Sequence, residues 1–239
     1  MKKLFTLLLA LLFLIPSASL AATDGFTVEY GDREQKRIAI TIDDCYGLEY
    51  VRAALDISQE NSVPFTFFVL GNVLKQDDAD LWRAVATSSC EIGNHTYNHT
   101  KLSSLDDKDL YMQIMKTQAS LDAVLGYHYP MQVIRPPFGS WNSTVNRVFR
   151  SLGYDHTILW DIDSTDPVVC YKHIKNGSIL LFHARAKDIH CIKALLPRIL
   201  EDGYELVTVS EMFGKEPVAI TDEPYTFVPY STWREQQKR

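Results

Sequence analysis

The feature that most constrains the fold is a regular alternation of short strand-like runs with longer amphipathic stretches. Seven runs rich in β-branched and aromatic residues are expected to be strands. They are Arg37 to Thr41, Phe65 to Val69, Glu91 to Gly93, Gln132 to Ile134, His156 to Trp160, Ser178 to Phe182 and Glu205 to Val209. The stretches with apolar residues at helical spacing are Leu48 to Glu60, Asp78 to Thr87, Asp106 to Leu125, Thr144 to Leu152 and Ala186 to Glu201. This order predicts an α/β fold with parallel strands and right-handed crossovers, in either a barrel or an open doubly wound sheet.

The N-terminus has the pattern of a signal peptide. Lys2 and Lys3 precede an apolar run from Leu4 to Ile15, and small residues follow Pro16. The competing interpretation is a membrane anchor, but the run is shorter than the roughly 20 residues that span a bilayer. We therefore divide the chain into a signal peptide at 1–22, a folded domain at 23–214 and a C-terminal tail at 215–239. The protein is expected to be exported, either to the periplasm or to the medium.

Composition and charge exclude some functional classes. With 46% hydrophobic and 23% charged residues, the chain has the composition of one globular domain. The net charge is −6, and it becomes about −8 once Lys2 and Lys3 are removed with the signal peptide. An acidic chain of this kind is not expected to bind nucleic acid or, after cleavage, a membrane surface. We expect a monomer.

Polar side chains gather where two predicted strands end. The first strand runs directly into Asp43 and Asp44, and the third is followed by His95 and His99. Because functional residues in parallel α/β folds lie at the carboxyl ends of the strands, these groups are expected to meet at one rim. The four-residue spacing brings the two imidazoles together if a helical turn begins at His95. Two His and one Asp would hold one divalent metal with open positions for water and substrate; zinc is expected, while cobalt, manganese or nickel also fit.

Three further segments bring titratable groups to the same rim. They are Arg135-Pro136-Pro137-Phe138-Gly139, Trp160 to Asp166, and Leu181-Phe182-His183. Together with the Asp-Asp and His-containing segments, in this order, they resemble the polysaccharide deacetylase family, also called the NodB-homology or carbohydrate esterase 4 family. The resemblance covers the chain from about Arg37 to Val209, and the five motifs are specific as a set. It implies a distorted (β/α) barrel with about seven parallel strands.

The resemblance also implies roles for individual residues. Asp44, His95 and His99 would hold the metal, and Asp43 would be the general base. His183 would be the general acid, Arg135 would orient Asp43, and Asp166 would be an acidic partner further along the chain. The metal would polarise the acyl carbonyl while Asp43 takes a proton from water and His183 gives one to the leaving group.

Two more residues would shape the acyl pocket, and several positions depart from the family pattern. The resemblance implies that the backbone N–H of Phe138 helps to bind the oxyanion and that Leu181 lines the pocket for the acetyl methyl group. Cys45 stands where the family has Gly, and Pro167 stands where an aromatic residue commonly follows the fourth motif's acid. The pocket is therefore expected to differ from the family pattern beside the metal site and after the fourth motif.

The function implied by the resemblance is a metal-dependent hydrolase that removes acetyl groups from N-acetylated sugars of a peptidoglycan-like or chitin-like glycan, acting on linear amides. One alternative is an O-acetyl esterase of the xylan type. Another is a catalytically weak, glycan-binding member of the same fold. Retention of Asp43 and His183, which binding alone would not require, favours an enzyme.

The cysteines and the tail leave alternatives open. Four cysteines in an exported chain can pair, and Cys170 with Cys191 is the expected pair because both follow predicted strands at the same end of the fold. Cys45 adjoins the expected metal site, where it would either replace Gly sterically or form a disulfide. The tail from Glu216 to Arg239 has few periodic apolar residues, so it is either a strap across the barrel or disordered.

Overall fold

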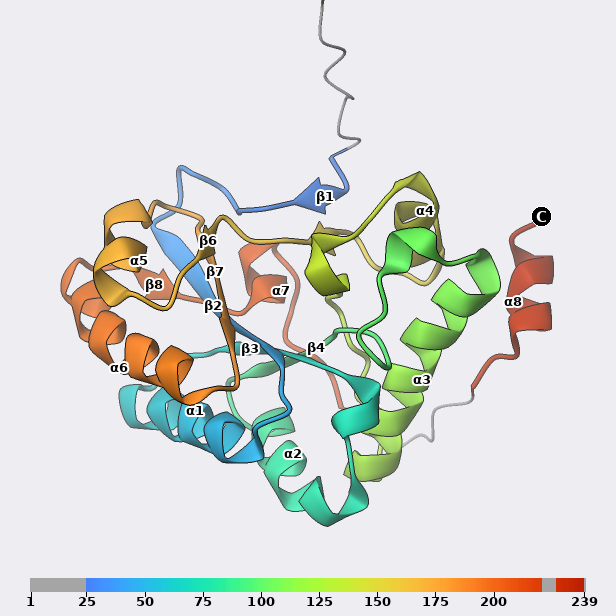
Figure 1. The fold of residues 1–239 in the computed structure, drawn as a ribbon, viewed down its shortest axis with the longest axis horizontal. Coiled ribbons are helices and arrows are strands. Elements are labelled where there is room, and N and C mark those ends of the chain that lie inside the picture. Colours follow the sequence, from blue (N-terminus) through green and yellow to red (C-terminus); the bar gives the residue numbers. More distant parts are fainter. Residues whose placement is uncertain (1–24, 221–226, 239) are drawn as a thin grey trace, which may run out of the picture.

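The computed structural model describes residues 25–220 and 227–238, and its elements alternate as the sequence predicts (Figure 1). The strands are β1 (Thr27–Val28), β2 (Arg37–Asp44), β3 (Thr66–Val69), β4 (Glu91–Asn94), β5 (Thr157–Ile158), β6 (Ile162–Asp163), β7 (Ile179–His183) and β8 (Glu205–Leu206). The α-helices are α1 (Leu48–Asn61), α2 (Ala79–Ala86), α3 (Asp107–Leu125), α4 (Ser143–Ser151), α5 (Pro167–His173), α6 (Ala186–Glu201), α7 (Val209–Met212) and α8 (Tyr230–Gln236). Four short 3₁₀ turns lie at Gly71–Val73, Gln76–Asp78, Leu102–Ser104 and Pro137–Gly139.

The strands pair in parallel around a central β2. The main sheet has the order β4-β3-β2-β7-β6, and β8 pairs with the first residues of β2. Single parallel bridges through Ile134 connect Asn94, at the end of β4, to Thr157 in β5, and β5 also pairs with β1. The segment 157–163 thus touches Ile134 at one end and β7 at the other. The predicted parallel α/β architecture is confirmed, although the hydrogen-bonded sheet is not continuous around the circuit.

Alternation along β2 separates two apolar cores. Ile38, Ile40 and Ile42 are fully buried in the core that the sheet shares with the helices. The intervening Ala39 belongs to a second, inner core with residues of other strands. By the same alternation Thr41 and Asp43 face inward, because successive side chains of a strand point to opposite sides. Polar groups at the carboxyl end of β2 therefore lie inside the barrel-like sheet.

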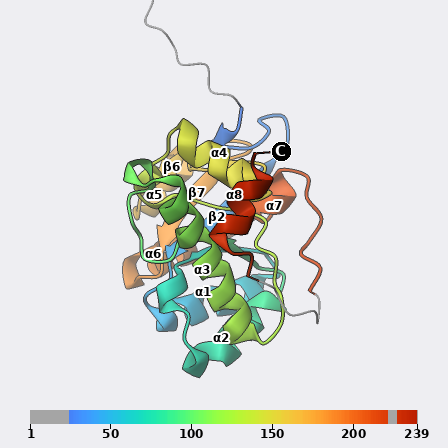
Figure 2. The ribbon, with the colours of Figure 1, turned by 90° about the vertical axis from the view of Figure 1, so that its right-hand side faces the viewer.

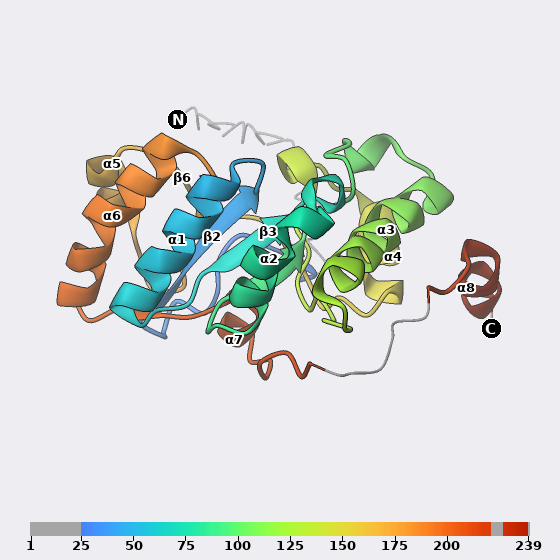
Figure 3. The same cartoon turned by 90° about the horizontal axis from the view of Figure 1, so that it is seen from below.

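The helices form two groups on either side of the sheet. Helices α1, α5 and α6 lie on one side, and α3 and α4 lie on the other, as Figures 1 and 3 both show. The longest helix, α3, starts where Asp106 accepts a hydrogen bond from the backbone N–H of Asp109, at 2.9 Å. It ends at Gly126, whose φ of 82° suits a residue without a Cβ.

The described part of the C-terminal tail packs against α3. Figures 1 and 2 show α8 beside that helix. Trp233 is buried, its ring centroid lies 4.9 Å from that of Tyr111, and the Tyr111 hydroxyl donates to the backbone oxygen of Val228. Residues 227–238 are thus an ordered strap on the outer surface of α3.

Several boundaries differ from the sequence-based prediction. The strand expected at Gln132 to Ile134 is reduced to bridges at Ile134. The last strand ends at Leu206 because a capping box between Thr208 and Glu211 starts helix α7. The predicted signal peptide at 1–22 lies outside the described residues. Within 25–220 and 227–238, no helix has both the length and the apolar character needed to cross a membrane.

Candidate active site and metal centre

The two adjacent carboxylates lie at the carboxyl end of β2. Asp44 and Cys45 both have left-handed backbone conformations, with φ of 67° and 60°. This turn of the chain ends the strand, so that Asp43 keeps its inward direction and Asp44 lies at the mouth. A left-handed φ is unfavourable for a residue with a Cβ, which explains why a Gly at position 45 would fit this backbone more easily than Cys.

The two histidines approach each other through a loop. The helical turn that the sequence analysis considered at His95 does not form. Thr96 and His99 have φ values of 73° and 61°, and the segment that carries both histidines follows β4 without helical structure. The loop is held from outside itself: Gln113 of α3 accepts hydrogen bonds from the backbone N–H groups of Tyr97 and Asn98. The imidazole centroids of His95 and His99 are nevertheless 5.3 Å apart.

Asp44, His95 and His99 form a group that could hold a metal ion, with one ligand atom from each lying within 4.8 Å of the others. Asp44 Oδ1 lies 3.2 Å from His99 Nε2 and 3.5 Å from His95 Nε2. His95 Nδ1 is 2.8 Å from the backbone oxygen of Arg135. Donation from Nδ1 to that carbonyl leaves Nε2 with its lone pair toward Asp44, which is the tautomer that binds metals.

The protonation of this group also suits a metal. Burial alone would raise the pKa of Asp44, but its interactions with His95 and His99 lower it, so the carboxylate is ionised. Burial lowers the pKa of His99, although Asp44 has the opposite effect. The lowered pKa favours the neutral imidazole. Asp44 Oδ1 is buried and makes no hydrogen bond within the described residues. A cation would satisfy this atom, so the residues present fit a divalent metal.

Asp43 is held by a buried arginine. Arg135 is fully buried and donates hydrogen bonds to Asp43 Oδ1 at 2.7 Å, to Thr41 Oγ1 at 2.6 Å and to the backbone oxygen of Leu159 at 2.9 Å. Its guanidinium also lies 4.2 Å from the ring centroid of Phe68. The other carboxylate oxygen of Asp43 is 3.7 Å from His95 Nε2. Arg135 therefore fixes Asp43 with one oxygen directed toward the group formed by Asp44, His95 and His99.

His183 lies opposite Asp43 at the end of the neighbouring strand, because the two residues are partners in the β2–β7 ladder. Asp188 of α6 is almost fully buried; its Oδ1 accepts the backbone N–H of His183 at 3.0 Å and lies 3.9 Å from His183 Nδ1. The interaction with Asp188 raises the pKa of His183, against burial and with help from Asp43 and Asp44. A histidine with a raised pKa is suited to donate a proton near neutral pH.

Asp166, which the resemblance placed as the acidic partner, has a different environment. It is exposed and caps α5, accepting hydrogen bonds from the backbone N–H groups of Val168 and Val169. Among the described residues, the carboxylate that interacts with His183 Nδ1 is Asp188. Sequence reasoning missed Asp188, although an Asp in the first turn of the helix that follows His183 was a signal that could have indicated it.

Phe138 and Leu181 lie beside the same group. Phe138 has φ of 59°, is 68% exposed, and its ring centroid is 4.4 Å from that of His99. Leu181 is buried in β7, two residues before His183, and is paired with Thr41 in the ladder. These positions bring both residues to the rim at which the ligand group and the two carboxylates meet.

The four cysteines are free in the structure. Cys170 and Cys191 lie on the packed helices α5 and α6, and Cys191 lowers the pKa of the Cys170 thiol. The disulfide expected between them is absent from the structure. Cys45 is fully buried, with its sulfur 3.7 Å from the backbone oxygen of Ile42, and burial raises the pKa of its thiol well above the usual value.

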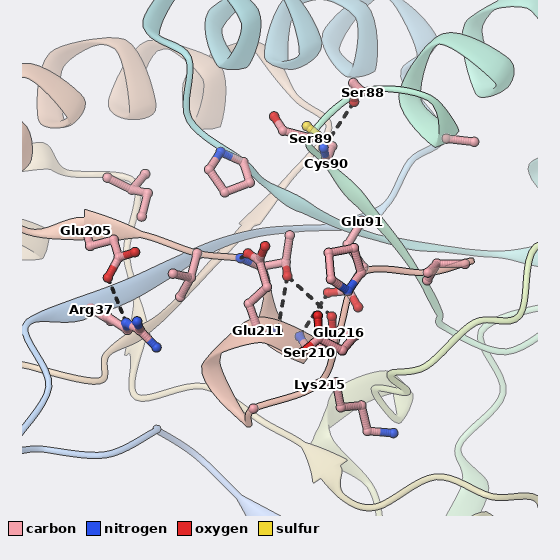
Figure 4. A pocket seen from close by; sticks show the side chains of 18 of the residues that line it. Arg37, Ser88, Ser89, Cys90, Glu91, Glu205, Ser210, Glu211, Lys215 and Glu216 are labelled. Atoms are coloured by element: carbon pink, nitrogen blue, oxygen red, sulfur yellow. Dashed lines mark hydrogen bonds and ion pairs between the residues drawn. The ribbon is translucent and has the colours of Figure 1, made fainter. Parts of the chain in front are cut away.

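A separate cavity of about 680 Å³ lies at the other end of the strands (Figure 4). Arg37, Glu91 and Glu205, which begin β2, β4 and β8, are among its lining residues. Glu91 is buried, accepts hydrogen bonds from Thr66 and Ser210, and has its pKa raised by burial. The cavity therefore shares no residue with the group around Asp44.

Comparison with known proteins gives a consistent family relationship. A family model described as "Polysaccharide deacetylase" matches residues 30–157. A peptidoglycan-N-acetylglucosamine deacetylase of Bacillus cereus is 31% identical over 203 residues, which cover 79% of this chain and 93% of that protein. The uncharacterized protein YlxY of Bacillus subtilis is 29% identical, and the peptidoglycan-N-acetylglucosamine deacetylase PgdA of Listeria monocytogenes is 30% identical. The matches cover 84% and 77% of this chain but only 64% and 40% of those two proteins.

Solved structures show the same fold. A carbohydrate esterase 4 family pseudoenzyme from Bacillus anthracis superposes with a TM-score of 0.71 at 23% identity, covering 81% of this chain and 71% of that one. The peptidoglycan deacetylase PdaC from Bacillus subtilis gives a TM-score of 0.65 at 26% identity, covering 76% of this chain and 92% of that one. The similarity extends to proteins described as enzymes and to one described as a pseudoenzyme.

Proposed function

Because the chain belongs to the polysaccharide deacetylase family, we propose that it is a metal-dependent hydrolase that removes acetyl groups from the N-acetylated sugars of a peptidoglycan-like or chitin-like glycan. The observation that carries the proposal is the arrangement of Asp43 and His183 as ladder partners on adjacent strands, with the ligand group of Asp44, His95 and His99 beside Asp43. A protein that only binds glycans does not need a base and an acid paired beside a metal site.

Asp44, His95 and His99 would hold the metal, for which we propose zinc. When bound, the ion would supply a Lewis acid for the acyl carbonyl and a water of lowered pKa. Asp43 would take a proton from the attacking water, since Arg135 holds its carboxylate in place at 2.7 Å. His183, protonated with the help of Asp188, would donate a proton to the departing sugar nitrogen.

Two exposed aromatic side chains support a sugar substrate. Tyr46 is 59% exposed. The pKa of its hydroxyl is raised by partial burial and, to a smaller extent, by the nearby charge of Asp44. Phe138 is 68% exposed, and its ring contacts the ring of His99. Exposed aromatic rings beside a polar centre can stack on the apolar faces of sugar rings. We propose that the enzyme acts outside the cytoplasm, where such glycans occur.

The test is acetate release from N-acetylglucosamine oligomers and from peptidoglycan glycan strands. Zinc-loaded mature protein is compared with chelated protein and with the Asp43→Asn variant. Metal-dependent acetate release that Asp43→Asn abolishes supports the proposal, because the variant keeps the side-chain volume but cannot accept the proton. Bound metal without acetate release from either substrate would contradict it.

A second candidate is a protein that binds glycans with little turnover. One observation that favours it is the backbone at Cys45, whose φ of 60° is unfavourable for a residue with a Cβ and occurs where the family has Gly. The other is that one of the proteins with a similar fold is described as a pseudoenzyme. The Cys45→Gly variant separates the two: a large gain in acetate release would identify the native chain as the weak member. An O-acetyl esterase would instead release acetate from acetylated xylan in preference to the N-acetylated glycans.

A further inference from the structure

Arg185 presents an unused positive charge at the mouth of the site. It lies two residues after His183, its side chain is 57% exposed, and its NH2 atom is 3.7 Å from Asp44 Oδ2. That distance is too long for a hydrogen bond, and none to the guanidinium occurs among the residues that the structure describes. The planar guanidinium therefore has its donors free for a ligand that approaches from solvent.

Asp44, which forms an ion pair with Arg185, is also a proposed metal ligand. Arg135 is already neutralised by Asp43 at 2.7 Å. A divalent ion beside Asp44 would use that carboxylate, so the attraction between Asp44 and Arg185 would weaken when the metal is bound. The mouth of the loaded site is then positively charged, although the whole chain has a net charge of −6. A neutral N-acetylated sugar can accept hydrogen bonds from the guanidinium but leaves its charge uncompensated.

The position of Arg185 limits which anion would fit. The residue adjoins a proposed metal ligand and lies close enough to His183 for its charge to lower the pKa of that imidazole, the opposite of the effect of Asp188. An anion bound there would lie close to the acetyl group under attack, so a carboxylate carried by the same sugar is placed to reach it. N-acetylmuramic acid carries such a carboxylate on its lactyl group, which is ether-linked to the ring carbon next to the one that bears the acetamido group. A guanidinium also binds a carboxylate through two parallel hydrogen bonds.

We infer that Arg185 is a specificity-determining residue that selects an N-acetylated amino sugar with a free carboxylate beside its acetamido group, as in N-acetylmuramic acid. The inference rests on the proposed function and narrows its substrate. Arg185 acts here on the bound sugar and takes no part in the proton transfers of Asp43 and His183.

The test measures binding separately from turnover. Zinc-loaded Asp43→Asn protein is titrated calorimetrically with a tetrasaccharide of alternating N-acetylglucosamine and N-acetylmuramic acid, and with the same tetrasaccharide after its lactyl carboxylates have been converted to carboxamides. The carboxylate form is expected to bind roughly tenfold or more tightly at low salt, the size of an effect expected for charge-assisted hydrogen bonds. Adding Arg185→Ala should remove this difference. Lys187→Ala, which removes an exposed cation two residues away, is the matched control and should retain it.

Each other outcome has a distinct meaning. Equal affinity of the two tetrasaccharides for the Arg185-containing protein would overturn the inference. So would an Arg185→Ala variant that weakens both ligands by the same factor, because the residue would then act through Asp44 and the metal. Failure of the wild-type protein to release acetate from any glycan would contradict the proposed deacetylase, whereas the preference for the carboxylate would still be measurable by calorimetry.

Discussion

The Arg135 guanidinium donates a 2.7 Å hydrogen bond to Oδ1 of Asp43 at a place where neither side chain reaches solvent. The same nitrogen also bonds to Thr41, and the second nitrogen bonds to the backbone of Leu159. The cation is therefore held on several sides before any ligand binds. The position of the proposed base is determined by the inner core of the fold and does not depend on the loops at the mouth.

Removing this arginine should destabilise the fold. In Arg135→Met, the buried carboxylate of Asp43 loses its partner, and the free energy of unfolding is expected to fall by about 3 to 5 kcal/mol. The double variant Asp43→Asn/Arg135→Met should recover part of the loss, because no unpaired buried charge remains. Urea denaturation of the four proteins of this cycle measures the effect. Arg52→Met, which removes an exposed arginine on α1, is the control and should change the stability by less than about 0.5 kcal/mol.

A divalent metal should stabilise the protein through the group formed by Asp44, His95 and His99. A ligand that binds only the folded state at a hundredfold excess over its Kd adds about 2.7 kcal/mol, which corresponds to a rise in Tm of roughly 5 to 10 °C for a domain of this size. Calorimetric melts with zinc and with a chelator measure this shift.

His99→Ala should abolish most of the rise in Tm, since it removes one of three ligands. His190→Ala changes an exposed histidine of α6 that lies outside the group, and it should leave the rise intact. An equal rise in the wild-type protein and in His99→Ala would show that zinc binds elsewhere.

The raised pKa of His183 predicts how activity and stability depend on pH. Its interaction with Asp188 favours the protonated imidazole, so the alkaline limb of the rate profile should lie above the usual histidine pKa of about 6.5. Protonated His183 also stabilises the fold of the metal-free protein. This contribution is fully present below the unfolded-state pKa and is lost as the pH rises through the folded-state pKa.

Asp188→Asn should move the alkaline limb to lower pH, because it removes the negative charge while keeping an oxygen for the backbone N–H of His183. The pH dependence of kcat/KM gives the position of the limb in both proteins. Asp166→Asn is the comparison: the exposed Asp166 caps α5, so its replacement should leave the limb in place. A shift with Asp166→Asn and none with Asp188→Asn would assign the acidic partner as the family resemblance does.

The sequence predicted the elements whose residues carry a long periodic signal. Helix α6 has the predicted bounds, Ala186–Glu201, and the end of β2 at Asp44 was correctly expected to carry both carboxylates. Strand β6 was not expected, because two residues have no detectable period and are a strand only through their pairing with β7. Helix α5 was missed because Val168 and Val169 favour strands, although Asp166 followed by Pro167 is a typical helix start.

Within the candidate site, residue types were easier to predict than contacts. The spacing of His95 and His99 suggested that they lie together, but the loop that joins them depends on hydrogen bonds that its backbone donates to Gln113 of α3. In the same way, the family motif indicated Asp166 as the acidic partner, whereas Asp188 is the carboxylate beside His183 in the structure. Its place in the first turn of α6 was a local signal that the motif comparison did not include.

Oxidation should join Cys170 to Cys191 and leave Cys45 and Cys90 reduced. The first two thiols lie on the packed helices α5 and α6, where Cys191 lowers the pKa of the Cys170 thiol, and all four cysteines are buried. With oxidised glutathione as the oxidant, each bond formed transfers two protons and two electrons to glutathione, whose disulfide breaks to give two molecules of reduced glutathione. The cross-link should add roughly 3 kcal/mol to the stability by constraining the unfolded chain. Alkylation followed by peptide mass spectrometry identifies the pair, and melts with and without reductant measure the gain. Cys90→Ser should retain both effects, Cys191→Ser should lose them, and four alkylated cysteines after oxidation would rule out the bond.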